Sequence, residues 1–81
     1  MPNRQKLDHA FRQGLGLDEN RIVEDLEYRS IPEWDSIAHM ALVAEIEDAF
    51  DVMLPTDDVI ALSSYNVCIE ILNKHGVTEI S

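Results

Sequence analysis

The chain has 81 residues, 6 basic and 16 acidic side chains and a formal net charge of -10, and 46% of its residues are apolar. This is enough apolar material for one globular core, so we expect a single domain over residues 1–81. The excess of acids argues against nucleic-acid binding, which needs Lys and Arg, and disfavours binding to anionic membranes. No apolar run approaches the ~20 residues of a membrane span, and no apolar leader follows Met1, so a cytoplasmic location is expected. The single cysteine, Cys68, excludes an internal disulfide, and no metal site is expected.

The first predicted element is a helix over residues 3–15. It carries a stripe of apolar residues at helical spacing, Leu7, Ala10, Phe11 and Leu15. Gly14 and Gly16 are expected to loosen its end. From Gly16 to Trp34 no period holds, and we expect a long connection that several apolar side chains pin to the core. An unstructured connection of this length is usually functional.

Residues 35–50 give the strongest helical pattern, with Asp35 or Ser36 as the N-cap. The stripe expected to face the core consists of Leu42, Val43, Ile46, Ala49 and Phe50. A second apolar group lies on another side and two acids continue it: Ile37, Met40, Ala41 and Ala44, followed by Glu47 and Asp48. This group either contacts the long connection or the short helix that follows, or forms a partner-binding patch beside Ser36.

The C-terminal third predicts two further helices. Thr56 can cap a short helix over residues 57–61, in which the helix dipole favours the carboxylates of Asp57 and Asp58, with weak cation binding as the alternative. Ser63 or Ser64 caps a last helix that runs to about Lys74 and buries a stripe of Tyr65, Cys68, Ile69 and Leu72. Lys74 and His75 suit the dipole at its end, and Gly76 suits the position after it. No strand is expected, so the fold class is all-α: a four-helix bundle of three main helices and a short third helix, with a long loop between the first two.

Few residues have the chemistry of an active site. Ser36 and His39 lie one helical turn apart, but a catalytic dyad also needs an orienting group and an oxyanion site. We therefore interpret His39 as a half-buried histidine with satisfied hydrogen bonds. Cys68 is interpreted as a buried, inert thiol.

Three further large side chains lie outside the stripes expected to face the core. We expect Met53 in the core and Met40 half exposed, where an adaptable apolar side chain suits transient partners. Trp34 either staples the loop to the bundle or helps to form the surface around Ser36, since large aromatic side chains serve both purposes.

The segment Asp35-Ser36-Ile37 resembles the Asp-Ser-Leu motif of acyl carrier proteins. The resemblance extends without obvious gaps from about Leu7 to Lys74. It includes Leu15-Gly16-Leu17 at the end of the first helix, Ile22 and Tyr28 as apolar loop anchors, Phe50-Asp51-Val52-Met53-Leu54-Pro55 after the second helix, and Leu62-Ser63-Ser64-Tyr65 before the last. The string Val23-Glu24-Asp25-Leu26 also looks familiar, but it lies ten residues before Ser36, and we treat it as chance.

The resemblance implies a carrier and not an enzyme. A phosphopantetheinyl transferase would attach 4′-phosphopantetheine from coenzyme A to Ser36, with Asp35 helping the transferase to engage it. The phosphodiester would meet unpaired N–H groups at the helix N-terminus. The thiol of this group would carry acyl or aminoacyl intermediates as thioesters.

The partners that the resemblance implies are the transferase and the enzymes that load and use the acyl or aminoacyl group, with basic docking surfaces. The residues expected to meet these surfaces are Ile37, Met40, Ala41, Ala44, Glu47 and Asp48, on a monomeric protein. Ala38 and Ala41 stand where fatty-acid carriers usually have acids, which argues against the primary fatty-acid pathway. The segment Trp34-Asp35-Ser36 resembles stand-alone carriers of specialised pathways more closely. An unmodified acidic helical interaction module is the alternative.

Overall fold

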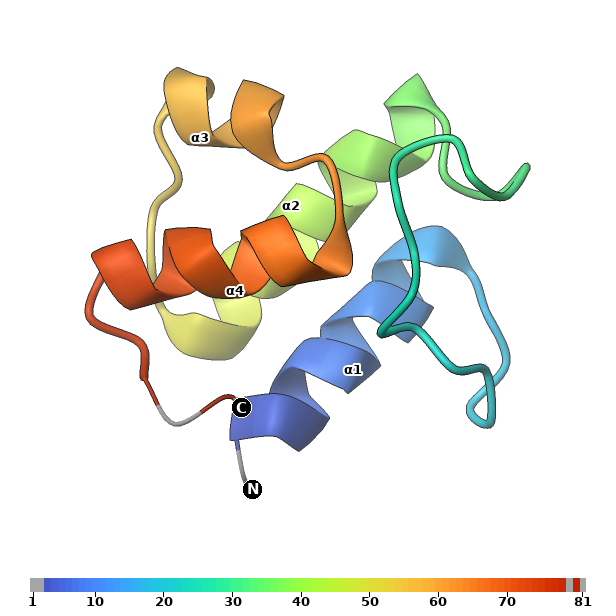
Figure 1. Cartoon of the computed structure of the whole chain (residues 1–81), viewed down its shortest axis with the longest axis horizontal. Helices are drawn as coiled ribbons and strands as arrows, with labels where there is room; N and C mark the ends of the chain where they lie inside the picture. The colour runs from blue at the N-terminus through green and yellow to red at the C-terminus, as the bar shows by residue number, and fades with distance from the viewer. Residues whose placement is uncertain (1–2, 79, 81) are drawn as a thin grey trace.

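The computed structural model describes residues 3–78 and 80. Its four helices are α1 (Asn3–Leu15), α2 (Ser36–Phe50), α3 (Thr56–Ala61) and α4 (Tyr65–Lys74) (Figure 1). The described residues contain no strand, although an isolated antiparallel bridge joins Glu27 and Ser64. The predicted all-α class and the bounds of the main helices are confirmed to within a residue. Met1 and Pro2, the start of the segment predicted to lack an apolar leader, lie outside the described residues. None of the helices seen is long and apolar enough to cross a membrane.

The core is built around three buried aromatic rings. Phe11 of α1 meets the Trp34 ring edge-on at 5.6 Å between centroids and the Tyr65 ring at 5.1 Å. Trp34 has no exposed surface, so it staples the loop to the bundle, and the alternative surface role is wrong. The predicted stripe of α2 is confirmed for Leu42, Val43 and Ile46, whereas Ala49 and Phe50 are only partly buried.

Helices α1 and α2 approach each other closely at Gly14. A Cβ atom at this position would lie 2.5 Å from Cα of Leu42. The prediction that Gly14 loosens the end of α1 is therefore wrong, because the residue lies inside the helix and allows close contact between two backbones. Gly16 ends the helix as expected, with φ of 67° in the left-handed region.

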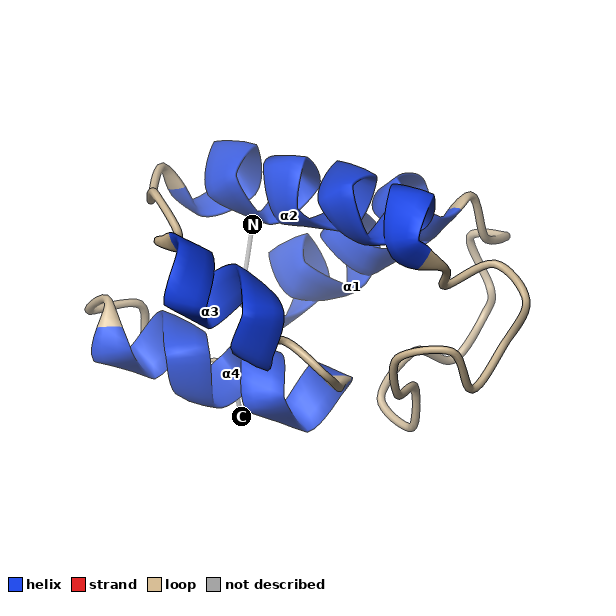
Figure 2. Cartoon of the chain, turned by 90° about the horizontal axis from the view of Figure 1, so that it is seen from above, coloured by secondary structure: helices blue, strands red, loops and turns tan. Residues whose placement is uncertain are grey.

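The long loop between α1 and α2 extends at the end of the bundle where α2 begins (Figure 2). Val23 and Leu26 anchor it, because both side chains are buried, whereas Ile22 is 65% exposed and Tyr28 is partly exposed. The prediction of Ile22 as an anchor is therefore wrong, whereas the ring of Tyr28 lies 6.1 Å from that of the buried Trp34. A turn explains the difference, since the amide of Leu26 donates to the carbonyl of Val23 and both side chains reach the core.

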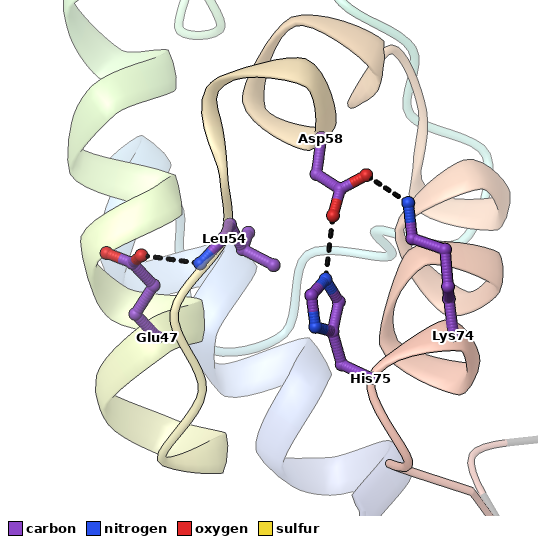
Figure 3. A network of polar contacts seen from close by, with 5 residues as sticks. All are labelled: Glu47, Leu54, Asp58, Lys74 and His75. Carbon is purple, nitrogen blue, oxygen red and sulfur yellow. Dashed lines mark hydrogen bonds and ion pairs between the residues drawn. The ribbon is translucent and has the colours of Figure 1, made fainter.

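Helix α3 departs most from its sequence pattern. Asp58 is its one buried residue; the carboxylate of Asp58 accepts hydrogen bonds from Lys74 Nζ and from His75 Nε2, the latter at 2.7 Å (Figure 3). The interpretation of Asp58 as a solvated residue at a helix start is thus wrong, and Lys74 and His75 bind this carboxylate besides lying at the end of α4. Pro55 precedes the helix, and no side chain caps it, so the predicted Thr56 cap is also wrong.

In the segment between α2 and α3, the prediction that Met53 lies in the core is wrong. Met53 is 86% exposed and Leu54 is buried in its place. The Glu47 carboxylate accepts a hydrogen bond from the Leu54 amide at 2.8 Å and holds this segment against α2 (Figure 3). Since successive side chains of an extended segment point to opposite sides, burial of Leu54 turns Met53 outward.

Helix α4 follows its pattern closely. Ser64 is its N-cap and accepts a hydrogen bond from the Val67 amide at 3.1 Å. Tyr65, Cys68 and Leu72 are buried as predicted, while Ile69 is only partly buried and Ile71 is buried instead.

Candidate functional site

Ser36 is the first residue of α2 and is exposed. Asp35 is the N-cap, and its Oδ1 atom accepts hydrogen bonds from the amides of Ile37 at 3.1 Å and Ala38 at 2.8 Å. The carboxylate thereby satisfies two of the amides that a helix start leaves unpaired. The expectation that a phosphodiester would meet these two amides unpaired is therefore wrong, and Asp35 has a structural role beside the one implied by the resemblance.

His39 has both ring nitrogens occupied. The indole N–H of Trp34 donates to Nδ1 at 3.0 Å, and Nε2 lies 2.8 Å from the carbonyl oxygen of Val59. Because an indole only donates and a carbonyl only accepts, the ring carries its proton on Nε2. The interpretation of His39 as a half-buried, satisfied histidine is confirmed. A Ser36–His39 dyad is not formed, because the ring has no nitrogen left to accept the serine proton.

The second apolar group of α2 is uncovered. Ile37 is 82% exposed and Met40 58% exposed, and both alanines of the group are exposed as well. We call these four residues, Ile37, Met40, Ala41 and Ala44, the α2 patch. Neither the long loop nor α3 covers it, so that alternative is wrong, while the half exposure predicted for Met40 is confirmed.

The two acids that follow the α2 patch differ from each other. Asp48 is exposed, whereas Glu47 is partly buried by its hydrogen bond to the Leu54 amide. Glu47 therefore helps to fix the segment after α2, and only Asp48 presents a free carboxylate at this side of the helix.

Two hollows lie beside α3. One, of about 430 Å³, is bounded by α2 and α3 and lined by Met40, Val43, Glu47, Leu54, Thr56 and Val59. The other, of about 220 Å³, is lined by Tyr28, His39, Val59, Ile60, Leu62 and Ser63. Val59 belongs to both, so the position of α3 sets the width of each hollow.

The thiol of Cys68 is not accessible to reagents in the folded protein. Cys68 is buried on α4, and burial raises the pKa of its thiol to about 12. Its interpretation as an inert packing group is confirmed. In the described residues, no cluster of three or more His, Cys, Asp or Glu side chains could hold a metal ion.

The sequence did not predict two sets of polar contacts: those of Asp58 with Lys74 and His75, and those of His39 with Trp34 and Val59. The pKa of the Asp58 carboxyl is held below its ordinary value by the hydrogen bond from Lys74 and then by that from His75. The sequence contained one sign of the cluster around Asp58, the basic pair Lys74 and His75 at the end of the last helix. The favourable interaction of these residues with the helix dipole was already a sufficient explanation for them.

Two curated relatives are similar to the chain over most of its length. An acyl carrier protein of Lactobacillus johnsonii is 27% identical over 70 residues, which cover 86% of this chain and 88% of the relative. An acyl carrier protein of Rubrobacter xylanophilus is 24% identical over 71 residues, which cover 88% of each chain. No family model matches the chain, and no solved structure matches it significantly.

These relatives and the four-helix fold agree with each other. The chain is similar to acyl carrier proteins over most of its length, which confirms the resemblance seen at Asp35-Ser36-Ile37. The general role that these relatives support is that of a carrier.

Proposed function

We propose that Ser36 is the attachment site for 4′-phosphopantetheine, which a phosphopantetheinyl transferase takes from coenzyme A. The observation that carries the proposal is an exposed hydroxyl at the first residue of α2, directly after the capping residue Asp35. The burial of Cys68 supports it, because a thioester carrier with no accessible thiol of its own needs an added one. When bound, the group supplies a thiol that accepts and releases acyl or aminoacyl groups as thioesters.

The residues around Ser36 fit this group. Negative charge is favoured near the N-terminus of a helix, and α2 has no acidic side chain in its first turn. Asp35 keeps the first turn formed while leaving the Ser36 hydroxyl exposed. In the transfer, the Ser36 oxygen bonds to the phosphorus that bears pantetheine, the diphosphate P–O bond of coenzyme A breaks, and adenosine 3′,5′-bisphosphate leaves. The hydroxyl proton passes to a base of the transferase or to solvent.

We further propose that partner enzymes dock on the α2 patch next to Ser36. Its exposed apolar side chains suit short-lived contacts, and Met40 can adapt to partners of different shape. The net charge of -10 and the exposed carboxylate of Asp48 favour enzymes with basic docking surfaces, chiefly through faster encounter. Glu47 contributes less, because its carboxylate already holds Leu54.

The first half of α2 is neutral, and this bears on the pathway. Ala38 and Ala41 carry no charge where an enzyme of fatty-acid synthesis would seek acids. We infer that the protein is a monomeric, stand-alone carrier of a specialised biosynthetic pathway in the cytoplasm.

Intact mass spectrometry after incubation with coenzyme A and a transferase of broad specificity tests the assignment. The wild-type chain should gain the mass of one phosphopantetheine, and Ser36→Ala should gain none while keeping its helical circular dichroism. Ser63→Ala is the matched control, because Ser63 is also exposed and precedes a helix. No gain by the wild type, or labelling that persists in Ser36→Ala, would favour the alternative of an unmodified interaction module.

Asp35 allows its two roles to be separated. Asp35→Asn keeps a side-chain oxygen that can accept from the amides of Ile37 and Ala38, but it loses the charge. Asp35→Ala loses both. If the transferase requires the charge, both variants should be labelled slowly; if it requires only a formed first turn, Asp35→Asn should be labelled at the wild-type rate.

A further inference from the structure

His39 lies where three segments of the chain meet. Its ring belongs to α2, accepts a hydrogen bond from the indole of Trp34 in the long loop, and donates one to the carbonyl of Val59 in α3. The imidazole and indole rings are nearly parallel, with 16° between their planes and 6.1 Å between their centroids. A continuous line of hydrogen bonds thus runs from the loop through α2 to α3.

Helix α3 is attached by polar contacts and by Val59, which is partly buried against the core. It has only six residues, its buried residue is the carboxylate Asp58, and Ile60 is 76% exposed. The last carbonyls of a helix lack partners within it, and His39 supplies one for Val59. Asp58 therefore ties α3 to α4, and His39 ties it to α2.

At the other end of the line, Trp34 directly precedes the pair Asp35-Ser36. Its side chain is wholly buried, and a buried indole N–H needs an acceptor, which here is His39. The Trp34 backbone is held as well, since its amide donates to Ile31 and its carbonyl accepts from Arg29. His39 Nδ1 thus helps to fix the position of Trp34, the residue directly before the N-cap of α2.

We infer that His39 is a positioning residue that couples α3 to the presentation of Ser36. Two states are involved. In the first state, which the structure shows, the His39 ring makes both of its hydrogen bonds, to Trp34 and to Val59. When α3 moves away and widens the hollows beside Val59, Nε2 loses its acceptor, and the ring can turn or change its tautomer. A turn of the ring or a change of tautomer removes the acceptor of Trp34, and through this step the hydrogen bond to α3 and the hydrogen bond to the residue before Asp35-Ser36 are coupled.

Amide hydrogen exchange tests this coupling without any partner enzyme. The amides of Val59 and Leu62 report on α3, because they donate to the carbonyls of Pro55 and Asp58. The Cys68 amide, which donates to Ser64 in α4, is the internal control. His39→Leu should speed exchange in α3 about two- to tenfold, the effect of one hydrogen bond of ordinary net strength on an opening equilibrium. His39→Gln, which can accept from the indole and donate to Val59, should restore the wild-type rates.

Trp34→Phe gives the sharper result. This change keeps an aromatic ring in the core and removes the donor on the far side of His39 from α3. It also removes part of a buried ring, so the double variant with His39→Leu is needed to separate the two effects. Coupling predicts faster exchange at Leu62 with the Cys68 amide unchanged, and no further increase when Trp34→Phe is combined with His39→Leu. If Trp34→Phe leaves α3 at the wild-type rate, or if His39→Gln behaves as His39→Leu does, the coupling is refuted and His39 merely caps α3.

The consequence for Ser36 rests on the proposed function and has its own readout. His39→Leu and Trp34→Phe should raise the KM of the transferase for the carrier, with a smaller effect on kcat, and His39→Gln should not. An unchanged KM in both variants would overturn the link to Ser36. A wild-type protein that is never labelled would instead overturn the attachment site, and the exchange experiment would still decide the coupling.

Discussion

Replacing Gly14 by alanine sets two effects of opposite sign against each other. Helix propensity alone favours alanine inside α1 by about 0.5–1 kcal/mol. The new methyl group, however, would lie 2.5 Å from Cα and 3.0 Å from N of Leu42. These are backbone atoms of α2, which cannot rotate away as a side chain can. An ordinary contact of ~3.5 Å requires α1 and α2 to separate by about 1 Å.

We expect the steric term to win. Overpacking a well-packed site costs about 1–3 kcal/mol, so Gly14→Ala should lower the free energy of unfolding by about 1–2 kcal/mol after the gain in propensity. With a urea dependence of about 1 kcal/mol/M for a small protein, the midpoint should fall by about 1 M or more. Urea unfolding followed by circular dichroism measures this directly.

Gly16 is the matched control, because nothing lies within 4 Å of a Cβ atom at that position and its φ is positive. Gly16→Asn should be nearly neutral, since asparagine tolerates the left-handed conformation, whereas Gly14→Asn should be at least as harmful as Gly14→Ala. A rise in the urea midpoint of Gly14→Ala would show that helix propensity decides, and it would refute the close approach of the two helices.

Three further predictions concern the core, the buried carboxylate and the thiol. Ile46→Ala should lower the free energy of unfolding by about 2–5 kcal/mol, because the side chain is wholly buried, and chemical denaturation against the wild type measures the loss. The pKa of Asp58 is lower in the folded protein than its ordinary value of 3.8. The ionised carboxylate therefore stabilises the fold fully at a pH above 3.8, and this stabilisation is lost as the pH falls through the pKa of the folded state. The difference in melting temperature between wild type and Asp58→Asn should therefore shrink in acid, and a constant difference down to pH 2 would contradict this. Cys68 should resist a thiol reagent at neutral pH and react fully in urea; fast reaction in the folded protein would show that the thiol is accessible.

The helices could be predicted because their signals are local. The apolar stripe of α1, the Asp35 cap of α2 and the Ser64 cap of α4 depend on residues within one or two turns. The same holds for Ser36, since its motif lies on three consecutive residues. Periodicity and capping thus predict the helix, and the resemblance of its first residues to a family motif indicates the candidate site.

The errors arose where a distant contact decides the outcome. Met53 and Leu54 have similar apolar character, and the hydrogen bond from the Leu54 amide to Glu47 helps to fix which of them faces the core. Asp58 is buried because Lys74 and His75, seventeen or fewer residues away, reach it. No local pattern distinguishes such a carboxylate from a solvated one, and none reveals that His39 joins a loop to another helix.

Trp34 is the single tryptophan of the chain, and it sits immediately before the Asp35-Ser36 pair. Its indole is shielded from water and stacked near the imidazole of His39. The wavelength and the quenching of its fluorescence therefore report on the junction between the long loop and α2. The protein therefore carries an intrinsic fluorophore at the site where its loop becomes a helix. The proposed loading of Ser36 can therefore be tested by the emission of Trp34, without an added dye.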